Sequence, residues 1–169
     1  MKVLEFTGLK NVQKVTAGLS QLLADLQVFY TNIRGFHWNI KGKNFYVLHK
    51  KFEDMYNDAA EKVDEIAERL LMLGEAPKHN YSDYLKVSKI KESPLVSDGD
   101  QALKNILETY KYLIQLERRI SADAAEIGDD ATVTLMGKKE ILLWLLINII
   151  FCIKMLYTQK TYSNCSCIS

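Results

Sequence analysis

Apolar residues recur every three to four positions along four long stretches of the chain, a spacing that places them on one face of an α-helix. The four stretches cover roughly residues 12–34, 45–74, 97–128 and 129 onward. Gly35 and then Lys41-Gly42-Lys43-Asn44 interrupt the pattern after the first stretch and predict a break between the first two helices. The sequence therefore predicts four long amphipathic helices.

The longest connection lies between the second and third predicted helices, over residues 75–99, and residues 82–85 predict one short helix inside it. Two up-and-down helix pairs joined by a long crossover form the ferritin-like bundle arrangement. We therefore expect an all-α fold, a ferritin-like four-helix bundle with a short extra helix between helices 2 and 3. The length of 169 residues suits a single domain, residues 1–169, with a sizeable core.

Composition and charge exclude several classes of protein. Apolar residues make up 48% of the chain and charged residues 25%, which is an ordinary globular balance. The net charge of +1 gives the whole chain no electrostatic footprint for nucleic acid. The N-terminal residues lack the basic and apolar regions of a secretory signal, so the expected compartment is the cytoplasm.

The end of the chain differs in composition from the rest. Residues 141–153 are almost wholly apolar, and all three cysteines, Cys152, Cys165 and Cys167, lie in the last 18 residues. This is no disulfide framework, and incidental thiols are favoured over a metal or redox pair. The apolar run is interrupted by Asn148 and is shorter than the roughly 20 residues of a membrane span, so no membrane is expected. A shifted reading frame would produce such a switch.

The chain has three histidines, His37, His49 and His79. A di-iron site inside one ferritin-like bundle uses a Glu-x-x-His step, which points both side chains inward. The residues three positions before these histidines are Arg34, Tyr46 and Ala76. A metal site within one bundle therefore lacks its main ligand motif.

A different set of ligands arises if two copies of the chain meet. Asp64 and Glu68 are four residues apart and share one helix face. His49 precedes Asp64 by 15 residues, a rise of about 22 Å along one helix, so the two cannot share a metal within one chain. Antiparallel pairing of two copies across a two-fold axis would bring each His49 to the other copy's acids, and His37 could join them. The alternative is that the histidines are packed rings or caps and that the acids are a solvated face.

The stretch from Asn32 to Leu73 resembles the signature region of Dps-family mini-ferritins. The residues that carry the resemblance are His37-Trp38-Asn39, Gly42-Lys43-Asn44-Phe45, Leu48-His49-Lys50-Lys51-Phe52, Tyr56 and Asp64-Glu65-Ile66-Ala67-Glu68-Arg69. The likeness extends more weakly over residues 5–136, and the segment 137–169 is atypical.

This resemblance implies a homo-oligomer, a hollow dodecamer with non-haem iron sites at its two-fold interfaces. The ligands would be His37 and His49 of one subunit with Asp64 and Glu68 of the other. The implied activity is that of a ferroxidase, which oxidises iron(II), preferably with hydrogen peroxide, and stores it as ferric mineral. Such chemistry protects the cell against oxidative stress.

Other residues have weaker assignments. Trp38 is a candidate electron donor, with a buried core aromatic as the alternative. Glu53 and Asp54 are candidates for mineral nucleation at the cavity surface, although Lys50 sits where many relatives carry an acid. Three acids are candidates for a negative pore that draws iron(II) inward, with a solvated helix face as the alternative: Asp123, Glu126 and Asp129.

Two competing functions remain open from the sequence. One is a DNA-binding, nucleoid-protecting protein with little iron chemistry. The basic residues among residues 1–14 are Lys2, Lys10 and Lys14, and Glu5 is an acid among them. We expect Lys10 and Lys14 on the first helix, so the sequence gives DNA binding through a lysine-rich tail little support. The other is a helical bundle attached to a membrane through residues 141–157.

Overall fold

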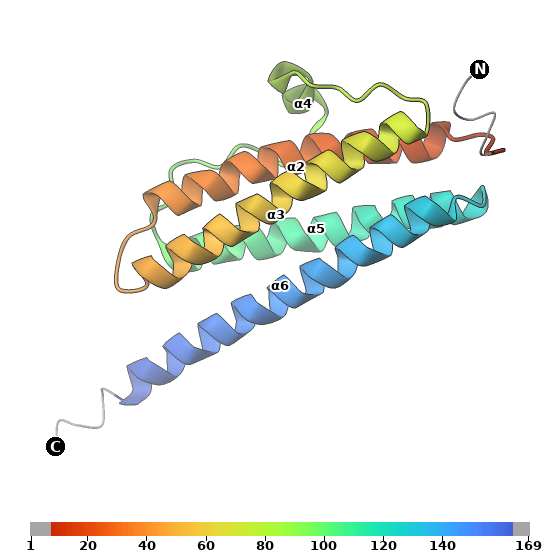
Figure 1. Cartoon of the computed structure of the whole chain (residues 1–169). Helices are drawn as coiled ribbons and strands as arrows, with labels where there is room; N and C mark the ends of the chain where they lie inside the picture. The colour runs from red at the N-terminus through yellow and green to blue at the C-terminus, as the bar shows by residue number, and fades with distance from the viewer. Residues whose placement is uncertain (1–7, 164–169) are drawn as a thin grey trace.

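The structure is a computed structural model that describes residues 8–163, and its regular elements over that range are all α-helices (Figure 1). The helices are α2 (Gln13–Asn39), α3 (Phe45–Met72), α4 (Tyr81–Val87), α5 (Gly99–Glu126) and α6 (Asp130–Ser163). The predicted fold class is confirmed: four long helices form the bundle, and the short α4 lies in the connection between α3 and α5.

The first long helix is longer than the sequence predicted. The expected break at Gly35 is wrong, because α2 continues to Asn39, whereas the break predicted at residues 41–44 lies between α2 and α3. The Asn39 side chain donates a hydrogen bond to the carbonyl oxygen of Gly35 at 2.8 Å, and Phe36 is buried one residue later. Packing and this hydrogen bond therefore outweigh the weak helix preference of one glycine. The chain then turns at Gly42, whose φ of 99° favours glycine.

Each long helix buries one apolar face in a common interior. Helix α2 packs against α3 and α5, and α6 packs against α5 (Figure 1). Fully buried side chains come from the stripes that the sequence predicted, among them Leu22 and Ile33 of α2, Phe52 and Ile66 of α3, and Ile106 and Leu113 of α5. These faces fix the relative positions of the two helices that carry the candidate ligands, α2 and α3.

The crossover is fastened to α2 by the buried side chain of Asp25. One carboxylate oxygen of Asp25 accepts hydrogen bonds from the Ser88 hydroxyl at 2.9 Å and from the backbone N–H of Lys89 at 2.7 Å. The other accepts from the hydroxyl of Tyr112, on α5, at 2.6 Å. A buried carboxylate with this many donors is well stabilised, and it ties the crossover to both α2 and α5.

Helix α6 continues well past the point where the sequence ceases to resemble the family. Its C-terminal end extends beyond the ends of the other long helices (Figure 1). Large apolar side chains are exposed along it: Ile141, Trp144, Leu145, Phe151 and Met155. Within residues 8–163 no helix has a stretch long and apolar enough to cross a bilayer. Cys152 is exposed on α6, whereas Cys165 and Cys167 lie outside the described residues.

Candidate metal centre

The short turn between α2 and α3 brings His37 and His49 face to face. Their rings stack with centroids 3.7 Å apart and planes inclined by 22°. The two residues also exchange hydrogen bonds, because Nδ1 of His37 lies 2.8 Å from the carbonyl oxygen of His49, and Nδ1 of His49 lies 2.8 Å from that of His37. The two histidines of the predicted metal site are therefore adjacent.

This exchange of hydrogen bonds sets the chemical form of each ring. A carbonyl oxygen only accepts, so each Nδ1 must carry the proton and donate it. In a neutral imidazole the other nitrogen, Nε2, then keeps its lone pair, which is the form that binds a metal ion. Hydrogen bonding of the non-ligating nitrogen also holds a ligand ring in orientation. Both histidines are thus prepared as ligands through Nε2.

Aromatic neighbours hold the histidine pair in place. The ring of Tyr56, seven residues after His49 on α3, meets His37 edge-on with centroids 5.3 Å apart. On the other side, Phe45 stacks against His49 at 4.9 Å. Both histidines are half-buried, so the pair is supported on one side and accessible on the other.

The two carboxylates of the predicted site lie elsewhere on the same helix. Asp64 and Glu68 are exposed and lie one turn apart on α3, about 22 Å beyond His49 by helical rise. Among the residues that the structure describes, no group of three or more histidine, cysteine or acidic side chains could hold a metal ion. In one copy of the chain the candidate ligands therefore lie in two separated groups, two imidazoles and two carboxylates, which are called the imidazole (or histidine) and carboxylate half-sites of the predicted site.

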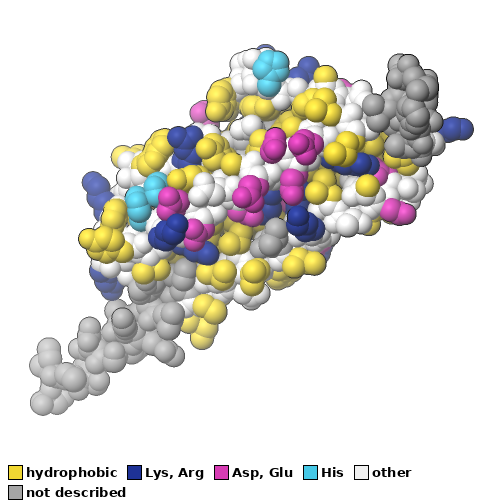
Figure 2. Space-filling model, viewed as in Figure 1, with side chains coloured by type: hydrophobic (Ala, Val, Ile, Leu, Met, Phe, Trp, Pro, Cys, Tyr) yellow, Lys and Arg dark blue, Asp and Glu magenta, His cyan; other side chains and the backbone are white. Residues whose placement is uncertain are grey.

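Figure 2 shows both kinds of side chain on one face of the molecule. Histidine side chains lie toward the end where α3 begins, and acidic side chains gather further along the same face (Figure 2). The exposed acids of α3 include Glu61, Asp64 and Glu68. Side chains of both types, histidine and acidic, are therefore present on this face of the molecule.

Comparisons with known proteins agree with this fold. A family model described as the ferritin-like domain matches residues 16–142. The chain is 49% identical over 151 residues to a DNA protection during starvation protein of Porphyromonas gingivalis, covering 86% of this chain and 95% of that protein. The chain belongs to the Dps group of the ferritin-like family.

Solved Dps structures share the arrangement of the helices. The Dps protein of Vibrio cholerae O1, described as a member of a superfamily of ferritin-like diiron-carboxylate proteins, matches with a TM-score of 0.77 and 42% identity, over 82% of this chain and 89% of that chain. A Dps protein of Bacillus brevis matches with a TM-score of 0.81 and 28% identity, over 83% of this chain and 95% of that chain.

The interior of this Dps-family bundle does not fit a metal centre of its own. The ammonium groups of two buried lysines lie there, with Lys62 paired to Asp58 and Lys139 paired to Glu65. The buried carboxylate of Glu117 accepts no hydrogen bond from the described residues. Lysine ammonium groups repel metal cations. Their presence in the bundle interior therefore agrees with the absence of a Glu-x-x-His motif from the sequence.

Near the histidine pair, the acids Glu53 and Asp54 are already paired with a cation. The Lys50 ammonium lies 3.0 Å from a carboxylate oxygen of Glu53 and 3.2 Å from one of Asp54. Hydrogen bonds from Lys50 to Glu53 and then to Asp54 raise the pKa of the lysine, which remains charged. The two candidate nucleation residues are therefore largely neutralised by a residue of their own helix.

The three acids considered for a pore differ in their surroundings. Glu126 is exposed and Asp123 is nearly buried, and the ammonium of Lys14 lies 3.4 Å from the first and 2.7 Å from the second. Lys14 lies in the first turn of α2, as expected, whereas Lys10 precedes that helix. The third acid, Asp129, is only 2% exposed, so its carboxylate is not available to line a pore surface. We assign Asp129 a structural role instead.

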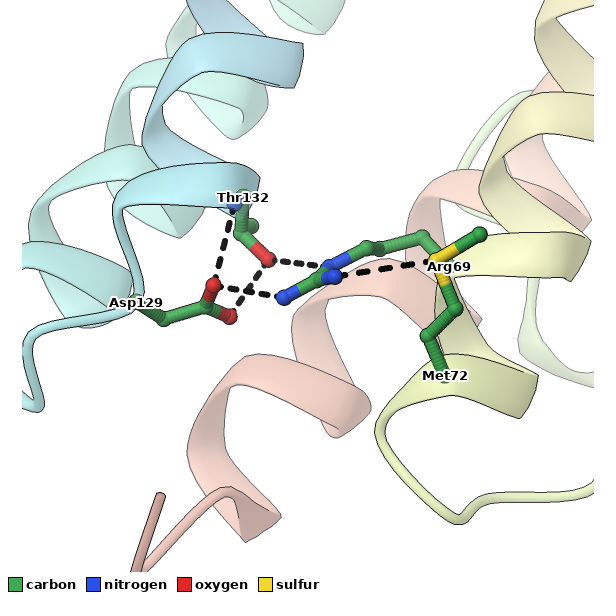
Figure 3. A network of polar contacts seen from close by, with 4 residues as sticks. All are labelled: Arg69, Met72, Asp129 and Thr132. Atoms are coloured by element: carbon green, nitrogen blue, oxygen red, sulfur yellow. Dashed lines mark hydrogen bonds and ion pairs between the residues drawn. The ribbon is translucent and has the colours of Figure 1, made fainter. Parts of the chain in front are cut away.

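That role is a polar network that joins the carboxylate half-site to α6 (Figure 3). Arg69, which follows Glu68, donates from Nη2 to Asp129 at 2.5 Å and from Nε to the Thr132 hydroxyl at 2.9 Å. Burial raises the pKa of Asp129, but hydrogen bonds from Arg69 and Thr132 outweigh burial and the pKa is lowered overall. Nothing in the sequence pattern indicated this link, although Arg69 belongs to the motif that carries the family resemblance.

Trp38 does not belong to the core. Its side chain is 63% exposed, so the alternative of a buried aromatic is wrong. The guanidinium of Arg34 lies over the Trp38 ring at 4.7 Å, while the neighbouring His37 ring contacts His49 and Tyr56 instead. Adjacency in sequence to His37 therefore does not place the indole against the histidine pair.

Proposed function

We propose that this protein is a ferroxidase that binds iron(II) at sites shared between two subunits, oxidises it with hydrogen peroxide and stores it as ferric mineral. The storage compartment would be the interior of a homo-oligomeric shell, a dodecamer, in the cytoplasm. The observation that carries the proposal is the division of one chain into an imidazole half-site and a carboxylate half-site. Two such halves complement each other in ligand type.

The chemistry of the ligands supports iron. Carboxylates are hard oxygen donors that suit iron, and imidazole nitrogen suits it as well. His37 and His49 would contribute Nε2, and Asp64 and Glu68 of the second copy would contribute carboxylate oxygens. Two ferrous ions would each give one electron to one hydrogen peroxide, whose O–O bond breaks and which takes up two protons to form two waters. No electron is then left for hydroxyl-radical formation.

Exposed apolar residues on α3 support the pairing of two copies. Tyr46 and Val47 are 85% and 49% exposed beside the histidine half-site, and Leu71 and Met72 are 56% and 51% exposed beyond the carboxylate half-site. In an antiparallel pair of α3 helices, the first patch of one copy would face the second patch of the other. Burial of these side chains would favour the same arrangement that completes the metal site.

The remaining candidates have supporting roles in this proposal. Glu53 and Asp54 would help nucleate mineral when iron displaces Lys50. Asp123 and Glu126 would attract iron(II) at a pore when Lys14 is displaced. Trp38 would act as an electron donor at the surface.

The test is anaerobic loading with iron(II) followed by hydrogen peroxide, with iron oxidation followed by absorbance and particle size by light scattering. Three proteins are compared: wild type, the His37→Ala/His49→Ala double variant, and the His79→Ala variant. His79 is an exposed histidine outside both half-sites, so its variant controls for the loss of a surface histidine. Wild type and His79→Ala should oxidise iron rapidly into soluble mineral within a large particle.

The double variant should lose the fast phase by a factor of about 100 or more, because loss of a group that only orients a ligand already costs about 10- to 100-fold. Equal, slow oxidation in all three proteins would overturn the proposal. Retention of the large particle by the double variant would show that the loss concerns the site and not assembly.

A second candidate function is DNA protection by direct binding. The observation that favours it is the name of the P. gingivalis relative, a DNA protection during starvation protein. Electrophoretic mobility shifts at increasing salt would test it, because binding through lysines weakens steeply with salt. Salt-sensitive binding by the wild type, without ferrous oxidation, would favour this candidate over the ferroxidase.

A further inference from the structure

The C-terminal half of α6 has two opposed faces. One face is buried against the bundle and includes Leu143 and Ile150, which are 2% and 0% exposed. The other face is exposed, and its positions are 141, 144, 145, 148, 151, 152 and 155. Large apolar side chains occupy five of these positions, each 49–70% exposed: Ile141, Trp144, Leu145, Phe151 and Met155. One copy of the chain thus leaves a continuous apolar face of α6 uncovered.

The exposed face of α6 follows a seven-residue period. Positions 141, 148 and 155 are seven residues apart, and positions 144 and 151 follow the first two of them by three residues. This is the a and d spacing of a coiled coil, in which a helix packs against a second helix with the same period. Positions 145 and 152 flank the d positions on the same face. The period therefore indicates that another helix covers this face.

The polar atoms on this face do not oppose its burial. The indole N–H of Trp144 donates to the carboxylate of Glu140, one turn earlier, at 3.3 Å. Asn148, at the central a position, donates from Nδ2 to the carbonyl oxygen of Trp144 at 3.0 Å. Within the described part of the chain, this leaves Asn148 with a second N–H and with Oδ1 for a partner. The Asn148 of a second copy offers the matching donor and acceptor, and an asparagine at one a position fixes the register of such pairs.

Charge and area both favour a second copy of this chain as the partner. Residues 141–153 contain no charged residue, so the same face of two copies can meet without repulsion between like charges. Covering the five large side chains would bury on the order of 500 Å² per copy, judged by the roughly 150–250 Å² that one aromatic side chain buries. Two copies would together bury on the order of 1,000 Å², about the area that a specific interface needs.

A lipid bilayer suits this face less well. Within residues 8–163 no helix has a stretch long and apolar enough to cross a bilayer. Asn148 lies at the centre of the exposed face, and the hydrocarbon of a bilayer offers its amide no hydrogen-bond partner. A second helix with an asparagine at the same level does offer one.

We propose that the exposed face of α6 binds the same face of a second copy, as a parallel pair in register with Asn148 against Asn148. This face lies opposite the one packed on α5, so a second copy can bind without displacing α5. The C-terminal end of α6 also extends beyond the other long helices, which leaves it accessible to a partner (Figure 1). The contact requires no metal and is separate from the pairing of α3 helices that would form the iron site.

The experiment uses the full-length protein with Cys152→Ser/Cys165→Ser/Cys167→Ser, so that each cysteine added is its single thiol. Asn148→Cys and Met155→Cys place the thiol at two a positions of the proposed contact. Lys104→Cys, at an exposed position of α5, is the control. Disulfide-linked dimers formed under mild oxidation are measured by non-reducing electrophoresis, because a disulfide needs Cα atoms within about 7 Å.

Both Asn148→Cys and Met155→Cys should form linked dimers at least about tenfold faster than Lys104→Cys, because equivalent a positions meet in a parallel pair. An antiparallel pair centred on Asn148 would bring Met155 next to Ile141 of the other copy. Fast linking at position 148 alone would therefore overturn the parallel register. Linking no faster than the control at both positions would overturn the contact.

A second set of variants, made in the Asn148→Cys protein, tests the apolar face itself. Trp144→Glu/Phe151→Glu should slow linking at least about tenfold, because like charges would then face each other across the contact. Leu95→Glu, which changes a 79% exposed apolar residue of the crossover, should leave linking unchanged. Circular dichroism checks that all variants keep their helix content.

Linking that survives the two glutamates in a folded protein would overturn the proposal. A competition with phosphatidylcholine vesicles tests the bilayer in the same way. Linking in the Asn148→Cys protein should be the same with and without vesicles, and the protein should not float with them. Flotation together with loss of linking would place a membrane on this face and overturn the second copy as its partner.

Discussion

Glu117 lies on α5 in the interior of the bundle, with 1% of its surface exposed. Burial raises the pKa of its carboxyl to about 8, and the charges of Lys62 and Lys139 offset only part of that effect. Asp58 and Glu140, both negative, raise the pKa further. Near neutral pH the Glu117 side chain is therefore protonated and uncharged. In each of the two lysine–carboxylate pairs of the interior, the positive and the negative charge cancel.

This protonation makes the stability of the fold depend on pH. The folded pKa of Glu117 lies above its ordinary value of 4.5, so its contribution is fully present below pH 4.5 and is lost as pH rises through about 8. We expect Glu117→Gln, which cannot ionise, to gain stability relative to wild type as pH rises, by on the order of a few kcal/mol at pH 9. Urea unfolding between pH 5 and 9 at fixed protein concentration measures the difference.

The matched control is Glu61→Gln, which removes an exposed acid of α3. Its stability should run parallel to that of wild type across the same range. A Glu117→Gln curve that also ran parallel to wild type would mean that the buried carboxyl keeps an ordinary pKa.

The sequence provided the candidate ligand residues but not the contacts that hold them. Histidines and acids at ligand spacing are visible in a sequence. The acceptors that fix the tautomers of His37 and His49 are backbone carbonyl oxygens, which every residue has and which only the fold brings into range. Glu117 gave no signal either, because α5 contacts both α2 and α6 and so buries a wider face than one apolar stripe marks.

At the scale of the element, α5 begins with a side-chain cap. Asp98 precedes the helix and its carboxylate accepts a hydrogen bond from the backbone N–H of Gln101 at 2.8 Å. The cap satisfies one of the N–H groups that a helix leaves without a partner in its first turn. It also fixes where the crossover ends and α5 begins.

Asp98→Ala should lower the free energy of unfolding by about 1 kcal/mol, the usual effect of losing an N-cap. Asp100→Ala is the control, because Asp100 is exposed in the same first turn and its loss removes only a favourable charge near the helix N-terminus. Urea unfolding at neutral pH compares the two. Equal losses in both variants would show that the capping hydrogen bond contributes nothing beyond charge.

The elements themselves were predictable to different degrees. The second and third long helices and the short α4 lie close to their predicted ranges. Glycines with positive φ, Gly74 and Gly128, follow the ends of the two long helices and agree there with the apolar period. The end of α2 was wrong, because a single glycine does not stop a helix whose next turn, with Phe36 and Ile40, is buried. That extra turn carries His37 to within stacking distance of His49, so the error concerned the site directly.

At the scale of the whole molecule, the proposed site needs two copies, and this makes it open to a complementation test. Two variants that each lack one half-site, His37→Ala/His49→Ala and Asp64→Ala/Glu68→Ala, should both be inactive alone. Mixed in equal amounts, dissociated and reassembled, half of the dimers would be hybrid, with one complete site each. We expect recovery of about a quarter of the wild-type ferroxidase sites.

Ferrous oxidation by peroxide measures the recovery, and the same mixture without dissociation is the control. A reassembled mixture as inactive as either variant would contradict a site shared in this way. The sequence could suggest this arrangement because helical rise alone separates His49 from Asp64 by more than a metal can bridge. It could not predict the exposed apolar residues at both ends of α3, because exposure depends on how the helices pack.

The exchange of hydrogen bonds between His37 and His49 has a consequence for how such a site changes over evolutionary time. Each ring is oriented by the main-chain oxygen of the other residue, so it depends on that residue's place in the chain and not on its identity. A substitution at one of the two positions leaves the anchor of the remaining ring intact. Metal preference could therefore drift through one exchanged donor at a time, cysteine or aspartate for histidine, with a correctly held imidazole at every intermediate stage.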